Sequence, residues 1–234
     1  LSQEKRYEKA AQSMSQKPLE EEQIQLFFSD IEPLATSKVL VLLENETLSI
    51  GERVLAQELQ LTVRGQDKIG IIGPNGVGKS TLLGKLQQLL SGKSEISLGF
   101  MPQNYQETLQ LDLSPVEFLS QTGHKEELQK IQSFLASLNF SYPEMHHQIR
   151  SLSGGQQGKL LLLNLVLRKP NFLLLDEPTR NFSPTSQPEI RKLFDTYPGG
   201  LITVSHDRHF LKEVCSIIYR LTEHGLEVVS LEDL

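Results

Sequence analysis

A glycine-rich turn between a predicted strand and a predicted helix constrains this chain more than any other feature. Lys68–Ile72 is a short apolar run, and leucines recur at helical spacing over Ser80–Leu90. Between them the sequence matches G-x-x-x-x-G-K-[ST] with Gly73, Pro74, Asn75, Gly76, Val77, Gly78, Lys79, Ser80 and Thr81. Glycines allow backbone N–H groups to surround phosphate oxygens, and a helix N-terminus attracts an anion. The turn therefore predicts a nucleotide-phosphate site, with Lys79 on the β- and γ-phosphates and the Ser80 hydroxyl on Mg²⁺.

Strands alternate with helices along the rest of the chain, which indicates an α/β fold with a mainly parallel core sheet. A further apolar stretch, Gln23–Phe28, is expected to form an edge strand. The expected core strands are Val39–Leu43, Leu59–Val63, Lys68–Ile72, Phe172–Leu175 and Leu201–Val204, and the expected helices are Ser80–Leu90, His124–Leu138 and Gln156–Leu167.

Charge and composition exclude several classes of protein. The 23 basic and 29 acidic residues give a net charge of −6, which argues against this segment alone gripping a nucleic acid backbone. The single cysteine, Cys215, rules out a disulfide framework within the chain and fits a reducing compartment. The longest apolar run, Leu160–Leu167, is far shorter than the ~20 residues that span a bilayer, so we expect no membrane segment in this chain.

The apolar strand Phe172–Leu175 is followed by two carboxylates, Asp176 and Glu177. The carboxyl ends of parallel strands line the ligand crevice of an α/β sheet. Asp176 is therefore expected near Mg²⁺, and Glu177, on the other face of the strand, is a candidate base for the attacking water. Taken alone, the pair would also fit a surface turn.

A second glycine motif precedes the helix expected at Gln156–Leu167. Ser153, Gly154, Gly155 and Gln156 form another potential anion site at a helix N-terminus. The alternative is a structural N-cap, because serine is a favoured capping residue. One nucleotide needs one phosphate cradle, so a second cradle suggests a head-to-tail pair in which each Ser153 helix closes the partner's site.

Two further residues are weak signals by themselves. His206 follows the strand Leu201–Val204, where a neutral imidazole could hydrogen-bond a γ-phosphate or the attacking water. Gln103 follows a short apolar stretch, and its amide could reach the metal or the water.

The glycine loop, Gln103, the run Leu152–Gln156, the run Leu173–Thr179 and His206 occur in the order of an ATP-binding-cassette ATPase domain, which residues 38–222 resemble. The resemblance implies a P-loop NTPase fold with an antiparallel β edge and a small helical subdomain at about 104–168. It also implies ATP and Mg²⁺ as ligands and ATP hydrolysis within a head-to-tail sandwich. In that sandwich Glu177 resembles the catalytic glutamate, His206 the γ-phosphate switch and Gln103 the lid-loop glutamine. Residues 153–156 resemble the signature contributed in trans.

Within that superfamily the chain resembles the F subfamily of soluble, cytoplasmic proteins with two cassettes. Residues 204–211 are similar to its SHDRxFL motif, and the segment between Gln103 and Leu152 is short. Residues 1–30 resemble the end of the charged linker before the second cassette, which would leave 31–234 as the nucleotide-binding domain. The chain would then be the C-terminal half of a longer protein that acts on the ribosome through regions outside this fragment.

Two positions depart from the subfamily pattern. Ser183 stands where the contact loop usually carries an aspartate, a variant that resembles the Vga-like branch, which protects ribosomes from lincosamides, streptogramin A and pleuromutilins. Ile50 occupies the position of the aromatic residue that usually stacks on adenine, which predicts loose base selectivity.

Three functions remain open from the sequence. The first is an ATPase whose open–close cycle acts on the ribosome, paired with the N-terminal cassette of the same protein or as a homodimer of the fragment. The second is the ATPase subunit of a membrane transporter, which needs a surface groove for a coupling helix. The third, a nucleotide binder without turnover, is disfavoured by the presence of Glu177 and His206.

Overall fold

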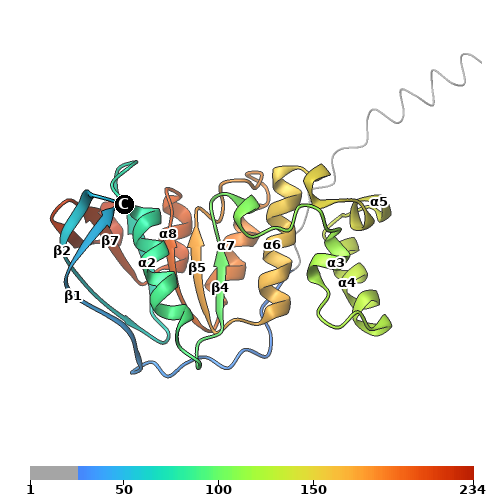
Figure 1. Ribbon diagram of the computed structural model, residues 1–234, viewed down its shortest axis with the longest axis horizontal. Coiled ribbons are helices and arrows are strands. Elements are labelled where there is room, and N and C mark those ends of the chain that lie inside the picture. Colours follow the sequence, from blue (N-terminus) through green and yellow to red (C-terminus); the bar gives the residue numbers. More distant parts are fainter. Residues whose placement is uncertain (1–25) are drawn as a thin grey trace, which may run out of the picture.

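The computed structural model describes residues 26–234, and a six-stranded sheet forms their centre (Figure 1). Its spatial order is β4-β5-β6-β3-β7-β8, and all neighbours pair in parallel except β7 and β8. The strands are β3 (Lys68–Ile72), β4 (Leu98–Met101), β5 (Phe172–Asp176), β6 (Gly200–Val204), β7 (Ile217–Thr222) and β8 (Gly225–Val229). This arrangement confirms the α/β fold with a mainly parallel core sheet.

A separate antiparallel pair, β1 (Val39–Ile50) and β2 (Arg53–Arg64), forms the second sheet. Both strands are longer than the expected Val39–Leu43 and Leu59–Val63, because residues between Glu44 and Glu58, polar and apolar alike, also pair across the hairpin. Register shifts interrupt this part of the ladder, so the alternation of apolar side chains is lost there. The expected antiparallel β edge is thus confirmed.

The two faces of the central sheet bury different partners. Phe172 and Leu174 of β5 pack with the β1–β2 pair and with α2 (Lys79–Ser91), whose leucines repeat at helical spacing. Leu173 and Leu175 point the other way and pack with α6 (Gly154–Arg168), α7 (Gln187–Asp195) and α8 (Arg208–Val214). Because β5 and β6 are covered on both faces, all of their residues are buried, as is usual for parallel strands.

Three helices lie together at the end of the molecule farthest from β1 and β2, to the right in Figure 1. They are α3 (Pro115–Leu119), α4 (Lys125–Ser137) and α5 (Tyr142–His146). Ile131 and Leu135 of α4 and Met145 of α5 share one buried cluster with α6. The long helix α6 therefore joins this group to the central sheet. Short 3₁₀ turns occur at Tyr105–Glu107, Ile149–Ser151 and Leu231–Asp233.

The three helices expected from periodicity are present as α2, α4 and α6, each shifted by no more than two residues at either end. The edge strand expected at Gln23–Phe28 is wrong for Leu26–Phe28, and Gln23–Gln25 lie outside the described residues. Leu26 and Phe28 pack against the core instead, and the Phe28 ring meets the Tyr197 ring edge-on at 4.8 Å between centroids. Their apolar character serves core packing rather than strand pairing.

Two glycines give opposite predictions for stability. A Cβ at Gly200 in β6 would lie 2.5 Å from Phe172 Cε2 and 2.7 Å from the Gly65 carbonyl oxygen, whereas a Cβ at Gly84 in α2 meets nothing within 4 Å. Gly200→Ala should lower the free energy of unfolding by about 1–3 kcal/mol through overpacking. Gly84→Ala should raise it by about 0.5–1 kcal/mol because alanine favours the helix. Urea unfolding of both variants checks this, and equal effects would contradict the packing of β6.

Candidate nucleotide site

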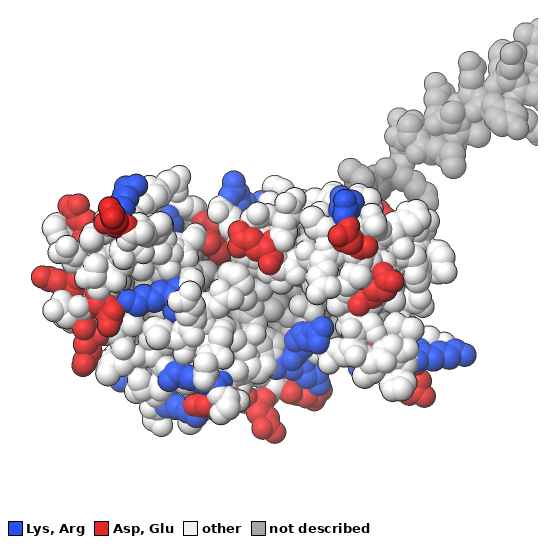
Figure 2. Space-filling view, viewed as in Figure 1, with Lys and Arg blue, Asp and Glu red and all other residues white. Residues whose placement is uncertain are grey.

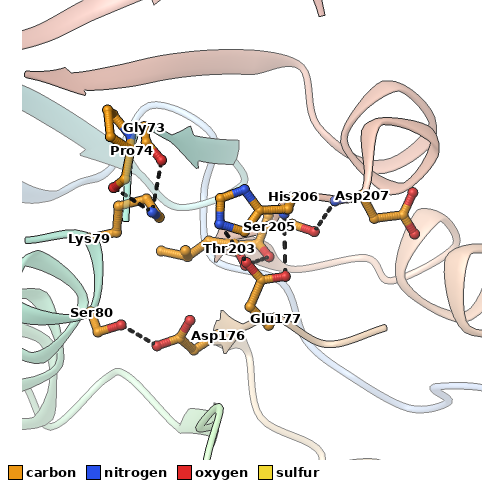
Figure 3. A network of polar contacts seen from close by, with 11 residues as sticks. Gly73, Pro74, Lys79, Ser80, Asp176, Glu177, Thr203, Ser205, His206 and Asp207 are labelled. Carbon is orange, nitrogen blue, oxygen red and sulfur yellow. Dashed lines mark hydrogen bonds and ion pairs between the residues drawn. The ribbon is translucent and has the colours of Figure 1, made fainter. Parts of the chain in front are cut away.

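A cavity of about 650 Å³ lies where the N-terminus of α2 faces the carboxyl ends of β5 and β6 (Figure 3). Residues from each of these elements line it, including Lys79 and Ser80 of α2, Asp176 of β5 and Val204 of β6. The parallel sheet thus brings together groups that lie up to about a hundred and thirty positions apart in the sequence.

The glycine loop between β3 and α2 has the backbone that the sequence predicts. Gly76 and Gly78 have φ angles of 80° and 110°, a region that side-chain-bearing residues rarely adopt. A Cβ at Gly78 would also lie 2.9 Å from Leu55 Cδ1. No side chain caps the first turn of α2, so its N–H groups are available to an anion. Gly73, Pro74 and Val77 belong to the loop without lining the cavity, whereas Asn75, Gly76 and Thr81 line it.

Lys79 is held inside this loop. Its ammonium donates hydrogen bonds to the carbonyl oxygens of Gly73 at 2.8 Å and Pro74 at 3.0 Å. Burial lowers the pKa of Lys79, while the nearby carboxylates of Glu177 and Asp176 oppose that change. A cation that is partly desolvated in this way gains strongly from an added anion, so the loop suits a phosphate.

Ser80 and Asp176 form the oxygen-rich part of the site. The Ser80 hydroxyl donates to Asp176 Oδ2 at 2.8 Å, and burial raises the pKa of Asp176 although this hydrogen bond opposes the rise. Residues 26–234 contain no cluster of three or more acidic, histidine or cysteine side chains that could hold a metal alone. Mg²⁺ typically takes one or two protein oxygens together with substrate phosphates and water, so the Ser80–Asp176 pair fits it.

Glu177 and His206 face each other across the end of the sheet (Figure 3). Glu177 Oε2 accepts the backbone N–H of His206 at 3.3 Å, and Glu177 Oε1 lies 3.5 Å from His206 Nε2. Strand alternation would turn Glu177 away from Asp176, but its φ of 53° rotates the chain so that both carboxylates line the cavity. Burial raises the pKa of Glu177, which suits a group that exchanges a proton.

The remaining wall of the cavity is mixed. Ile50 and Leu55, from the β1–β2 pair, supply apolar surface, and Gln103 is an exposed polar lining residue just after β4. Arg180 also lines the cavity, although none of the sequence motifs predicted it. The only sequence signal for a role of this residue in the cavity was its position directly after the run Leu173–Thr179.

The second glycine motif does not reach this cavity within one chain. Ser153, Gly155 and Gln156 line a different cavity of about 430 Å³, together with Asn181 and Ser183. Ser153 is the N-cap of α6, since its hydroxyl oxygen accepts the Gln156 N–H at 3.3 Å and Gln156 Oε1 accepts the Ser153 N–H at 3.0 Å. Ser183 exchanges hydrogen bonds with the Thr185 and Ser186 hydroxyls at 2.9 and 3.0 Å.

Comparisons with known proteins agree with this geometry. The sequence profile of the ABC transporter family matches residues 56–180. Among curated relatives, "Probable ATP-binding protein YheS" of Escherichia coli is 30% identical over 86% of this chain and 32% of its own length. "ABC transporter F family member 2" of Arabidopsis thaliana is 27% identical over 96% of this chain and 34% of its own length. "Ribosome protection protein VmlR" of Bacillus subtilis is 29% identical over 97% of this chain and 42% of its own length. The chain spans about a third of the length of the first two relatives.

Solved structures support the fold. A dimeric post-hydrolysis state of the ATP-binding cassette MJ0796, bound to ADP and Pi, superposes with a TM-score of 0.64 at 18% identity. It covers 80% of this chain, and 97% of that cassette is matched.

No helix within residues 26–234 is long and apolar enough to cross a bilayer. The family match includes the glycine loop and the acidic end of β5, which supply many of the residues that line the cavity. Family and cassette neighbours together support an ATP-hydrolysing enzyme. The chain belongs to the ABC transporter family and carries its ATPase domain.

Proposed function

We propose that the cavity between α2 and the carboxyl ends of β5 and β6 binds Mg²⁺-ATP and hydrolyses it. The observation that carries this proposal is the convergence of Lys79, Ser80, Asp176, Glu177 and His206 on one cavity. The glycine loop and Lys79 hold the phosphates. Ser80 and Asp176, with the Gln103 amide, hold the metal, which neutralises phosphate charge when bound. Glu177 accepts a proton from the attacking water, and His206 contacts the γ-phosphate.

The proposed site is completed in trans by a second cassette. Support comes from the separation of the two anion-binding helix ends, because Ser153 of α6 and Lys79 of α2 line different cavities of the same chain. A head-to-tail pair would place each Ser153 helix against the partner's glycine loop. The partner is the N-terminal cassette of the same protein or a second copy of this chain. Ile50 and Leu55 would contact the base.

For the whole protein, we propose the F subfamily, with this chain as its C-terminal cassette acting on the ribosome in the cytoplasm. The relatives named for the F family and for ribosome protection support this, as does the serine at position 183. In this proposal residues 1–30 end the linker, 31–234 form the nucleotide-binding domain and about 104–168 its helical subdomain. The Vga-like branch is proposed from Ser183.

Ribosome contacts are proposed to lie mainly outside this chain. Figure 2 shows Lys and Arg side chains interspersed with Asp and Glu over the visible face. With a net charge of −6, such a surface is unlike the basic patches that bind a phosphate backbone.

A second candidate is the motor subunit of a membrane transporter, and one observation favours it. A surface cavity of about 600 Å³ lies between β4, the 3₁₀ turn Tyr105–Glu107 and α6, with Phe100, Glu107 and Arg168 among its lining residues. A coupling helix from a membrane partner would need such a groove. The parent reading frame separates the two, because two cassettes support the ribosome proposal and a fused or neighbouring membrane segment supports the transporter.

Binding and turnover should separate in two variants of the chain. Glu177→Gln should bind ATP as tightly as the wild type but lose turnover by about 10²–10⁴-fold, because an amide cannot accept the proton. Lys79→Ala should instead weaken ATP binding by at least about tenfold, because the phosphates lose a charged partner. Calorimetric titration and phosphate release measure the two effects. Phosphate release at the wild-type rate from Glu177→Gln would show that Glu177 is not the base. Unchanged ATP affinity in Lys79→Ala would contradict phosphate binding by the glycine loop.

The pH dependence of turnover should reflect the burial of Glu177. A general base acts only when ionised, and burial raises the pKa of Glu177. As pH falls, kcat should therefore decline at a higher pH than an ordinary glutamate would give. A pH–rate profile measures this, with circular dichroism at each pH to show that the chain stays folded. A profile that is flat through the ordinary glutamate range and above would contradict the assignment.

The ribosome proposal predicts a growth phenotype. A host that expresses the full-length parent should tolerate a lincosamide or pleuromutilin at severalfold higher concentration than the empty host. Glu177→Gln in this cassette should abolish that tolerance, because the cassettes could no longer complete their cycle. Equal inhibitory concentrations with and without the parent protein would overturn the antibiotic role while leaving ATP hydrolysis untouched.

A further inference from the structure

Two short helices of the α3–α5 group begin with the same capping arrangement. Before α3, Glu117 Oε2 accepts the Ser114 N–H at 2.8 Å and the Ser114 hydroxyl at 2.7 Å. Before α5, Glu144 Oε2 accepts the Ser141 N–H at 2.7 Å and the Ser141 hydroxyl at 2.7 Å. In both cases one carboxylate oxygen satisfies the start of the helix, as in a capping box. The second carboxylate oxygen of each glutamate takes no part in the capping contact.

Only Glu144 directs that second oxygen to the Ser153 motif. Glu144 Oε1 accepts a hydrogen bond from Gln156 Nε2 at 2.6 Å, and the Gln156 side-chain oxygen accepts the Ser153 N–H. Hydrogen bonds from the Ser141 hydroxyl and N–H, followed by that from Gln156, lower the pKa of Glu144. The carboxylate is therefore ionised at neutral pH, and such charge-assisted bonds are short and strong.

This chain of contacts leaves the donors at the start of α6 open. The Gln156 side chain bonds to Glu144 through its NH₂ group and to Ser153 through its oxygen, so it links α5 to the end of α6. The Ser153 hydroxyl accepts the Gln156 N–H but keeps its own proton for donation. A Cβ at Gly154 meets nothing within 4 Å, so the surface beside this residue is open.

We propose that Glu144 is a positioning residue for the phosphate-binding end of α6: it fixes Gln156, which fixes Ser153. Glu144 itself touches no phosphate. This inference rests on the proposed function, because it assigns the Ser153 helix end to the phosphates of a partner cassette. It also assigns the α3–α5 group a task in that site, since α5 carries Glu144.

A reciprocal exchange tests the contact. In Glu144→Gln the amide can accept from Ser141 but presents its NH₂ to the NH₂ of Gln156, so one hydrogen bond is lost. In Gln156→Glu two carboxylates face each other. The double variant restores every bond, since the new amide at position 144 would donate to the new carboxylate at position 156, which would still accept the Ser153 N–H. Each single variant should lose about tenfold in kcat, and the double variant should recover most of it.

Glu117→Gln is the matched control, because it alters the same capping arrangement on α3. It should leave kcat within about twofold of wild type. The affinity of the single, unpaired chain for ATP, measured at a concentration too low for pairing, should stay unchanged in all variants, because that binding uses only the glycine loop. A fall in kcat without weaker ATP binding is a change that general unfolding would not produce. Equal losses for Glu117→Gln and Glu144→Gln, or no recovery in the exchange variant, would overturn the proposal.

Hydrogen exchange gives a readout that does not depend on catalysis. The Ser153 amide should exchange about tenfold faster in Glu144→Gln than in wild type or Glu117→Gln, and the double variant should restore its protection. Unchanged exchange at Ser153 would overturn the role of Glu144 even if kcat fell. If the wild-type chain hydrolyses no ATP, the proposed function fails, and the exchange rates alone then decide whether Glu144 positions Ser153.

Discussion

Parallel pairing of β3, β6 and β5 is the constraint on which the rest of this molecule depends. It aligns the carboxyl ends of the three strands, with Ile71 opposite Val204 and Val204 opposite Asp176. From those ends the chain leads into the glycine loop, the Asp176–Glu177 pair and His206. The burial of both sheet faces fixes this alignment, because a strand that slipped by one residue would exchange its two sets of apolar side chains.

At that edge of the sheet, burial destabilises the charged side chains while hydrogen bonds stabilise them. Burial raises the pKa values of Asp176 and Glu177 and lowers that of Lys79, so each ionised form is less stable there than in water. Hydrogen bonds from Ser80 and the His206 backbone, and those that Lys79 donates to loop carbonyls, offset part of this cost. The free protein therefore holds a partly desolvated cation beside partly desolvated acids. An added phosphate with a divalent metal would satisfy both, which is consistent with a site selected for binding rather than for stability.

The sequence alone predicted much of the fold and most residues of the cavity, because their chemistry depends on residue type. The glycines, Lys79, Ser80 and Asp176 could be recognised from one short pattern and one strand end. The orientation of Glu177 could not be predicted. Its backbone adopts a left-handed conformation that breaks strand alternation, and no neighbouring residue type signals that conformation. The Glu144–Gln156 bond was also out of reach, because it joins α5 to α6 through tertiary packing. Leu26–Phe28 showed the opposite error, in which apolar residues indicated a strand, whereas Leu26 and Phe28 pack against the core without strand pairing.

The segment after β5 connects the two cavities over a very short distance along the chain. Arg180 lines the first, and the next three residues, 181–183, line the second. Under the proposed pairing, each cassette contributes unlike halves to two composite sites. Damage to the glycine loop of one cassette and to the Ser153 end of the same cassette would then fall on different nucleotides. Two defective copies could complement each other in a mixed assembly, which makes the pair, and not the single chain, the unit on which selection acts.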